Sequence, residues 1–265
     1  MIAPRAAIFL AAGQGSRMGA LTAHYPKCLL PVGELAVLDT LLPQALKMGE
    51  REIVLVTGYQ VEAVQAWLNR FYPDAGITLV HNADYAQDVN ILSVEKGVNA
   101  LRFPERGYSI IETDILIDPR AWSQIHQAES SSTSFWLTHG RYSAGLTGGI
   151  VEVVDDALTI DRISYQPLYD EAFEGWFKMV GMLSVAPDEV AADRRLRRQA
   201  LKQGCNQYYM APWMAHRQAL PCVALDISRQ FARAFNTPAD YQHAVDDYQK
   251  LLSCTEELAH ANRVC

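Results

Sequence analysis

The sequence predicts an α/β fold: a Rossmann-like mixed, mainly parallel sheet with helices on both faces, followed by a small β-rich region. Strand and helix patterns alternate over about residues 1–120, an order that requires crossover connections and favours parallel strands. Short alternating strands dominate about residues 121–235, and a helical pattern closes the chain over residues 236–265. Because no repeat or linker separates these parts, we expect one domain over residues 1–265.

The first part contains four expected strands and three expected helices. Short apolar runs between turn residues indicate the strands, and apolar residues three and four positions apart indicate the helices. Gly49 ends the first helix, and Asn90 is a candidate cap of the third. In chain order, the elements are strand 6–12, helix 35–48, strand 52–57, helix 61–71, strand 77–81, helix 90–101 and strand 108–116.

The second half has shorter elements. Alternating apolar residues between turns predict strands, and Pro238 suits the first turn of the closing helix. The expected elements are strands 133–138, 149–154, 158–164 and 179–185, a charged helix over 187–203, and the closing helix from residue 237.

The composition is that of a globular protein with an acidic surface. Hydrophobic residues make up 49% of the 265 residues, and 23 Lys and Arg against 30 Asp and Glu give a formal charge of −7. This charge disfavours nucleic-acid binding, and no run approaches the ~20 apolar residues that cross a bilayer. The five cysteines show no metal-ligand spacing, so we expect neither a zinc site nor a disulfide framework and favour a reducing cytoplasm. They are Cys28, Cys205, Cys222, Cys254 and Cys265.

A glycine-rich loop directly after the first strand is the most specific signal. In residues 10–18 (Leu-Ala-Ala-Gly-Gln-Gly-Ser-Arg-Met), Gly13 and Gly15 allow close approach of the backbone to a ligand. Arg17 can bind phosphate through two donors, and Lys27, which follows a proline, supplies a second cation. We therefore expect this loop to bind phosphates.

Other types of phosphate loop fit less well. The dinucleotide fingerprint lacks its third glycine because Met18 stands there, and the second strand ends at Thr57 without the acidic residue that binds a ribose. The Gly-Lys-Ser/Thr sequence of a P-loop is absent. A tight turn without a ligand is the remaining alternative.

Several segments resemble the nucleotidyltransferases that activate sugar 1-phosphates and phosphocholine, and the last two resemble the phosphocholine and phosphonate cytidylyltransferase branch. These segments are residues 10–17 with Pro26 and Lys27, residues 29–33, residues 53–59, residues 81–85 and residues 90–93. The resemblance covers roughly residues 5–120. It implies that about residues 1–120 bind the nucleotide and about residues 121–235 bind the acceptor.

The resemblance also implies which residues surround the nucleotide. Those against the base and ribose are Leu10, Ala12 and Gly13, and those on the triphosphate are Gly15, Ser16, Arg17 and Lys27. Those near the base are Asn82, Asn90 and Ser93, and asparagine has the donors and acceptors to bind a pyrimidine edge. Helix capping is the alternative role of Asn90 and Ser93.

Two carboxylates end the strand expected over 108–116. Glu112 and Asp114 are two positions apart and point to the same face, so a cation such as Mg²⁺ is favoured between them. The resemblance implies that Asp114 is a metal ligand, that Glu112 is a second acidic residue of weaker role, and that Asn236 is the second ligand. Asn236 and Ala234 stand where many members have acidic residues, which lowers the charge at the metal. Capping of the closing helix is the alternative role of Asn236.

The acceptor side is indicated by Lys178, which resembles a lysine of the phosphocholine and phosphonate cytidylyltransferases and would neutralise the incoming phosphate or phosphonate. A solvated lysine at a strand end is the alternative. Aromatic residues are numerous enough to form a pocket, which would suit a quaternary ammonium group, although core packing also explains them. They are Tyr165, Tyr169, Trp176, Tyr208, Tyr209 and Trp213.

These implications describe a Mg²⁺-dependent cytidylyltransferase that transfers CMP from CTP to a small phosphorylated or phosphonate acceptor and releases pyrophosphate. Arg17, Lys27 and Lys178 are its expected catalytic charges. The alternatives are a sugar-1-phosphate nucleotidylyltransferase that uses UTP or dTTP, and a catalytically weak nucleotide-binding regulator. We expect CTP and the acceptor as partners, no nucleic acid or membrane, and a homodimer as a further candidate assembly.

Overall fold

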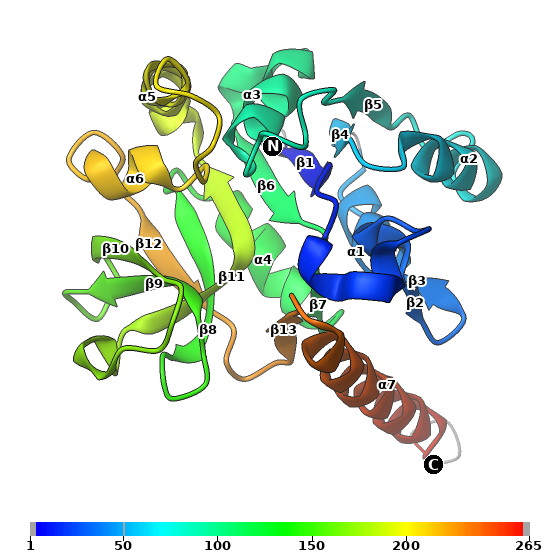
Figure 1. Cartoon of the computed structure of the whole chain (residues 1–265). Helices are drawn as coiled ribbons and strands as arrows, with labels where there is room; N and C mark the ends of the chain where they lie inside the picture. Colours follow the sequence, from blue (N-terminus) through cyan, green and yellow to red (C-terminus); the bar gives the residue numbers. More distant parts are fainter. Residues whose placement is uncertain (1–3, 50, 262–265) are drawn as a thin grey trace.

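One nine-stranded sheet runs through both halves of the chain in the computed structural model, which describes residues 4–49 and 51–261 (Figure 1). The strand order is β10-β9-β11-β6-β1-β4-β5, and β8 pairs with both β11 and β12. β1, β4, β5 and β6 pair in parallel, whereas β11 pairs with β6 in antiparallel orientation. The strands are β1 (Ala6–Ala11), β4 (Ile53–Thr57), β5 (Thr78–His81), β6 (Tyr108–Glu112), β8 (Phe135–Arg141), β9 (Gly148–Val153), β10 (Ile160–Gln166), β11 (Phe177–Val185) and β12 (Val223–Asp226).

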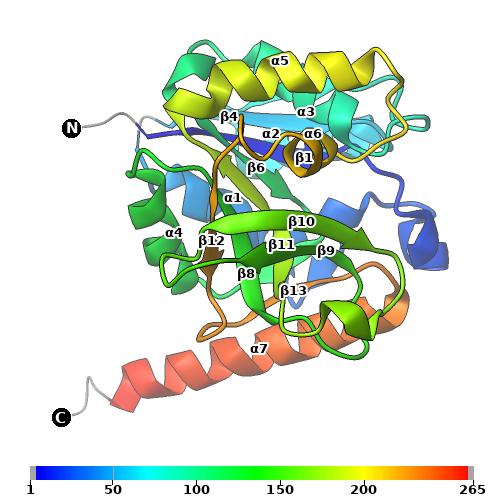
Figure 2. The same cartoon turned by 90° about the vertical axis from the view of Figure 1, so that its left-hand side faces the viewer.

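Alternate side chains of β1 enter two separate cores, because successive residues of a strand point to opposite faces. Ala7 and Phe9 pack with α1, α2, α4 and α7, while Ala6 and Ile8 pack with the other helices. Figure 2 shows α3, α5 and α6 on one side of the sheet and α4 and α7 on the other. The helices are α1 (Val37–Leu46), α2 (Val61–Phe71), α3 (Ile91–Ala100), α4 (Ala121–Glu129), α5 (Val190–Leu201), α6 (Ala211–Ala215) and α7 (Pro238–Ala261).

Two short ribbons complete the fold. β2 (Pro31–Val32) pairs with β3 (Leu35–Ala36), and β7 (Ile115–Ile117) pairs with β13 (Ala232–Ala234). Short 3-10 helices lie between the regular elements. They are η1 (Ser16–Thr22), η2 (Lys27–Leu29), η3 (Pro104–Arg106), η4 (Glu171–Phe173) and η5 (Pro187–Glu189).

The predicted mixed α/β fold is confirmed, but some elements differ from the expectation. The strand expected over 108–116 is interrupted at Thr113 and Asp114, because its second part leaves the main sheet and pairs with β13. The helix expected over 35–48 begins only at Val37, because the two preceding residues pair with β2. The elements α4, α6, β12 and β13 were not expected from the sequence, since each is short and its stability depends on tertiary contacts.

No helix within residues 4–49 and 51–261 is long and apolar enough to span a membrane. The cysteines that the structure describes are all free, and Cys265 lies outside the described residues. The free cysteines are Cys28, Cys205, Cys222 and Cys254.

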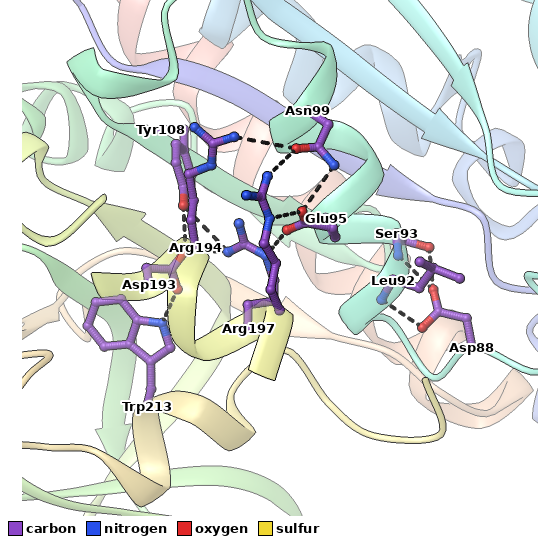
Figure 3. Close-up of polar contacts among 11 residues, drawn as sticks. Asp88, Leu92, Ser93, Glu95, Asn99, Tyr108, Asp193, Arg194, Arg197 and Trp213 are labelled. Carbon is purple, nitrogen blue, oxygen red and sulfur yellow. Dashed lines mark hydrogen bonds and ion pairs between the residues drawn. The ribbon is translucent and has the colours of Figure 1, made fainter. Parts of the chain in front are cut away.

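A buried polar network joins α3, α5, α6 and β6 on one face of the sheet (Figure 3). Asp193 accepts hydrogen bonds from the Tyr108 hydroxyl and, at 2.8 Å, from Trp213 Nε1. Asp193 also pairs with Arg197, whose Nε lies 2.9 Å from Glu95 of α3. Because these side chains are buried, the network holds α3 at a defined position against α5 and α6.

Replacing Asp193 by alanine should lower the free energy of unfolding by about 3–5 kcal/mol, because the Arg197 guanidinium would lose one partner of a buried ion pair. Urea denaturation followed by circular dichroism measures this change. The control is Arg195→Ala on the exposed side of α5, which should change stability by less than about 0.5 kcal/mol. Equal effects of the two substitutions would contradict the role given to the network.

Candidate active site

A cavity of about 740 Å³ opens at the carboxyl ends of β1 and β6, where ligands bind in open α/β sheets. The glycine-rich loop and the start of α3 line one end of it. Residues of β11, the loop before β9 and the segment before α6 line the other end. The two halves of the chain therefore contribute to a single cavity.

The glycine-rich loop is shaped by Gly15, which adopts a left-handed conformation with φ +66° and begins η1. Its carbonyl oxygen accepts hydrogen bonds from Met18 N at 2.8 Å and Thr22 Oγ1 at 3.0 Å. A Cβ atom at position 15 would lie 3.5 Å from Cδ of Lys27, so glycine permits both the turn and the close approach of the lysine. Gly13 has no atom within 4 Å of its Cβ position and borders open space.

Most of the residues predicted to surround the nucleotide line the cavity. Those that do are Leu10, Ala12, Gly13, Gly15, Arg17, Lys27, Asn90 and Ser93. Ser16 is exposed at the start of η1 and is not part of the lining. Asn82 is fully buried, and its amide donates to Asp88 and to Ser93 Oγ, both at 2.9 Å. A direct contact of Asn82 with a base therefore disagrees with the structure, in which Asn82 supports Ser93.

The cap of α3 is Asp88, which the sequence analysis did not identify. Its carboxylate accepts hydrogen bonds from Leu92 N at 3.0 Å, Ser93 N at 2.8 Å and Ser93 Oγ at 2.7 Å (Figure 3). Asn90 makes no capping hydrogen bond, because its Oδ1 accepts from Tyr209 N at 2.8 Å. An aspartate just before a helical pattern is a typical cap, and this signal was present at Asp88.

The pairing of β7 with β13 brings the two predicted metal ligands together. Asp114 precedes β7, Asn236 follows β13, and Phe235 N donates to the Asp114 carbonyl oxygen at 2.9 Å. Lys27 Nζ lies 2.8 Å from Asp114 Oδ2 and 3.4 Å from Asn236 Oδ1. Arg17 Nη2 donates to the same Asn236 oxygen at 2.8 Å. Four residues far apart in the sequence thus form one charged cluster at the nucleotide end.

The oxygen atoms of Asp114 and Asn236 fit a divalent cation, because they already converge on one ammonium group and oxygen ligands suit Mg²⁺. No group of three or more His, Cys, Asp or Glu side chains could hold a metal ion within the described part of the chain. A cation at this position would therefore need further oxygen ligands from water or from a bound ligand.

Glu112 and Lys178 lie at the acceptor end, at the boundary of β6 and β11. Burial raises the pKa of Glu112 to about 7, and the nearby Asp114 charge acts in the same direction. Burial lowers the pKa of Lys178 to about 8, against the opposing effect of Glu112. Lys178 Nζ donates to the carbonyl oxygens of Gly149 at 3.2 Å and Met179 at 2.6 Å. Lys178 is thus oriented by the backbone rather than freely solvated.

The six aromatic residues considered for a pocket do not form one together, because the fold divides them among three places. Tyr165, Tyr208 and Tyr209 line the cavity, while Trp213 is buried behind it. The other two, Tyr169 and Trp176, lie outside the lining; they pack on Tyr142 and Phe173, respectively. Trp136, which the sequence analysis did not identify, lines the cavity and stacks on Tyr209 with ring centroids 5.6 Å apart.

The family of the chain follows from its first half. Residues 7–145 match the family described as "MobA-like NTP transferase domain". The chain belongs to this family. The predicted membership in the nucleotidyltransferase superfamily is confirmed by this match. The predicted resemblance to its phosphonate branch agrees with the names of two relatives.

Two relatives of this MobA-like protein have names that include a phosphonate. The chain is 34% identical over 158 residues to 2-aminoethylphosphonate cytidylyltransferase from Lancefieldella rimae, covering 59% of each protein. It is 29% identical over 183 residues to CMP-5'-(3-aminopropyl)phosphonate synthase from Streptomyces rubellomurinus, covering 69% of this chain and 27% of that protein. The chain thus spans less than two thirds of the length of either relative.

Solved structures share the fold. CTP:phosphocholine cytidylyltransferase from Streptococcus pneumoniae is 19% identical with a TM-score of 0.74, and the match covers 92% of this chain and 98% of that chain. UDP-glucose pyrophosphorylase in complex with UDP-glucose is 15% identical with a TM-score of 0.75, covering 93% and 99%. At these identities the matches establish the fold of the MobA-like protein and not its substrates.

Replacing Asp88 by alanine should lower the free energy of unfolding by about 1–2 kcal/mol, because the first turn of α3 would lose its cap. Thermal and urea unfolding measure the loss. Asp84→Ala is the control, since Asp84 is exposed and, among the described residues, its carboxylate pairs only with Lys96, at 3.5 Å. Such a surface contact is worth at most about 1 kcal/mol. If Asp84→Ala were the more damaging substitution, the assignment of the cap would be wrong.

Proposed function

We propose that this protein transfers the CMP group of CTP to an oxygen of a small phosphonate or phosphorylated acceptor and releases pyrophosphate. The observation that carries the proposal is the cluster of Arg17, Lys27, Asp114 and Asn236, which lines the same cavity as Lys178. Several positive charges in one cavity suit a reaction between two anions. The cytidylyltransferase and synthase names of the two relatives support CTP as the donor and a phosphonate as the acceptor.

The nucleotide would lie along the glycine-rich loop. The loop places Gly13 at open space and Gly15 in a left-handed turn, which leaves backbone N–H groups of this segment available to phosphate oxygens. Arg17 and Lys27 would neutralise the triphosphate. Asn90 would lie near the base: its Oδ1 is bonded to Tyr209 N, while its amide N–H donors have no partner among the described residues.

Asp114 and Asn236 would hold Mg²⁺, together with phosphate oxygens of the nucleotide and water. The ion would supply charge neutralisation at the phosphates. Lys27 Nζ lies within hydrogen-bond distance of both oxygens, so an ion held between them would require the lysine to turn toward the triphosphate. The single carboxylate of this pair favours binding of the metal together with the nucleotide.

The acceptor oxygen would attack the α-phosphorus of CTP in line. The new P–O bond forms as the bond from the α-phosphorus to the bridging oxygen breaks, and pyrophosphate leaves with that electron pair. The attacking phosphonate oxygen is already ionised, so no general base is required. Lys178 is largely protonated at pH 7 with a pKa of about 8, and it would reduce the repulsion between the two anions.

A pyrophosphate-release assay tests the proposal. CTP, UTP, dTTP and ATP are each combined with 2-aminoethylphosphonate, phosphocholine and glucose 1-phosphate. We expect turnover with CTP and a phosphonate or phosphocholine. Turnover only with glucose 1-phosphate and UTP or dTTP would overturn the proposal in favour of a sugar-1-phosphate enzyme. CTP binding without any turnover would favour the regulator.

Lys27→Ala and Asp114→Ala should each lower kcat by about 100-fold or more, because each removes a charge that is oriented before the reaction begins. Steady-state kinetics of the purified variants measure the loss, and circular dichroism verifies that they fold. Lys202→Ala, an exposed lysine at the end of α5, is the matched control and should keep full activity. Wild-type rates in the Lys27 or Asp114 variant would show that the cluster is not the site.

Asn236→Asp should lower the Mg²⁺ concentration for half-maximal activity about 3- to 10-fold, because a second carboxylate raises the negative charge at the metal. The rate is measured over a Mg²⁺ titration at saturating CTP. Asn69→Asp on the exposed side of α2 adds the same charge elsewhere and should leave the titration unchanged. An identical response of both variants would place the metal away from Asn236.

A further inference from the structure

Glu112 lies at the acceptor end of the cavity, and none of the described residues forms an ion pair with it. Lys27 pairs with Asp114 at 2.8 Å, and Lys178 donates to two backbone carbonyl oxygens. The Tyr209 hydroxyl donates a hydrogen bond to the Glu112 carboxylate. A carboxylate accepts up to about four hydrogen bonds, so Glu112 has capacity left for a donor on a ligand.

The fold makes room for this carboxylate. β11 is irregular between Met179 and Leu183, and Gly181 in that stretch has φ +44°. A Cβ atom at position 181 would lie 3.2 Å from Cβ of Glu112, 3.3 Å from its Oε2 and 2.8 Å from Cγ2 of Ile115. Glycine therefore lets β11 pass close to Glu112 while the carboxylate keeps its place at the cavity.

The aromatic residues that line the cavity with Glu112 form stacked pairs. Tyr165 and Tyr208 stack with centroids 4.5 Å apart and planes inclined by 29°, and their hydroxyl groups are hydrogen-bonded at 2.8 Å. Trp136 and Tyr209 stack with planes inclined by 18°. A quaternary ammonium group is bound by open ring faces that surround it, whereas rings in these pairs cover each other on one side. The cavity lining that the structure describes therefore provides oxygen atoms that accept hydrogen bonds and does not provide an aromatic cage for a quaternary ammonium group.

A primary ammonium group fits these acceptors. It has three N–H donors, which the Glu112 carboxylate and tyrosine oxygens can accept, and a trimethylammonium group has none. Lys178 lines the same cavity and supplies a positive charge for the phosphonate. Together they match an acceptor with an anionic phosphonate at one end and a cation at the other.

We propose that Glu112 binds a primary ammonium group of the acceptor, so that the site selects aminoalkyl phosphonates over acceptors that lack an N–H donor. This inference rests on the proposed function, because it assumes a phosphonate acceptor at Lys178. In this role Glu112 determines specificity and takes no part in the transfer of the CMP group.

The test compares 2-aminoethylphosphonate with propylphosphonate, in which a methyl group replaces the ammonium group. With CTP and the unmutated protein, we expect kcat/KM to be about 10- to 100-fold higher for the amine, the range that a hydrogen bond to a charged group provides. In Glu112→Gln this ratio should fall to a few-fold. The fall should come from slower reaction of the amine, with KM for CTP and the Mg²⁺ requirement unchanged.

Glu105→Gln is the matched control, since Glu105 is exposed in η3 before β6 and should keep the wild-type ratio. Phosphocholine should behave like propylphosphonate in the unmutated protein. The inference would be overturned if the unmutated protein used both phosphonates equally, or if Glu112→Gln slowed both by the same factor, as a metal or packing role predicts. The comparison of the two phosphonates with the unmutated protein needs no variant, so it tests the inference even if Glu112→Gln folds poorly. Absence of pyrophosphate release with CTP and every acceptor would instead overturn the proposed function.

Discussion

The antiparallel pairing of β7 with β13 is the contact on which the arrangement of the site depends. It places Asp114 beside Asn236, although the two residues lie on either side of residues 121–235 in the sequence. Lys27 then reaches both side chains from the N-terminal part, and Arg17 reaches Asn236. Two cationic side chains thus meet at the nucleotide end of a protein whose formal charge is −7.

The opposite end of the cavity depends on how β11 crosses β6. The antiparallel pairing of these strands joins the two halves in one sheet, and the irregular stretch at Gly181 leaves space for Glu112. On the other face, the network of Asp193 and Arg197 holds α3 against α5, while Asn90 contacts the backbone of Tyr209. Ion pairs and a hydrogen bond therefore join the cavity wall at α3 to the cavity wall at Tyr209.

Long apolar runs and long amphipathic helices could be predicted, because their pattern is set by local geometry. Strands β1 and β4 and helix α2 lie close to the predicted ranges. Short elements such as β13 could not be predicted, since a three-residue strand is stable only beside its partner. Asn90 and Asp88 both have side chains that can cap α3, and only tertiary contacts show that Asp88 does so while Asn90 Oδ1 accepts from Tyr209 N.

By itself the sequence determined the α/β class, the phosphate-binding character of the loop at Gly13 and Gly15, and the membership in the nucleotidyltransferase superfamily. These depend on short-range patterns of apolar residues, glycines and charges. Tertiary contacts alone bury Asn82, divide the aromatic residues among three places, and leave Glu112 without an ion pair among the described residues. Each of these depends on which distant segments pack together, and the spacing of residues along a chain does not specify that.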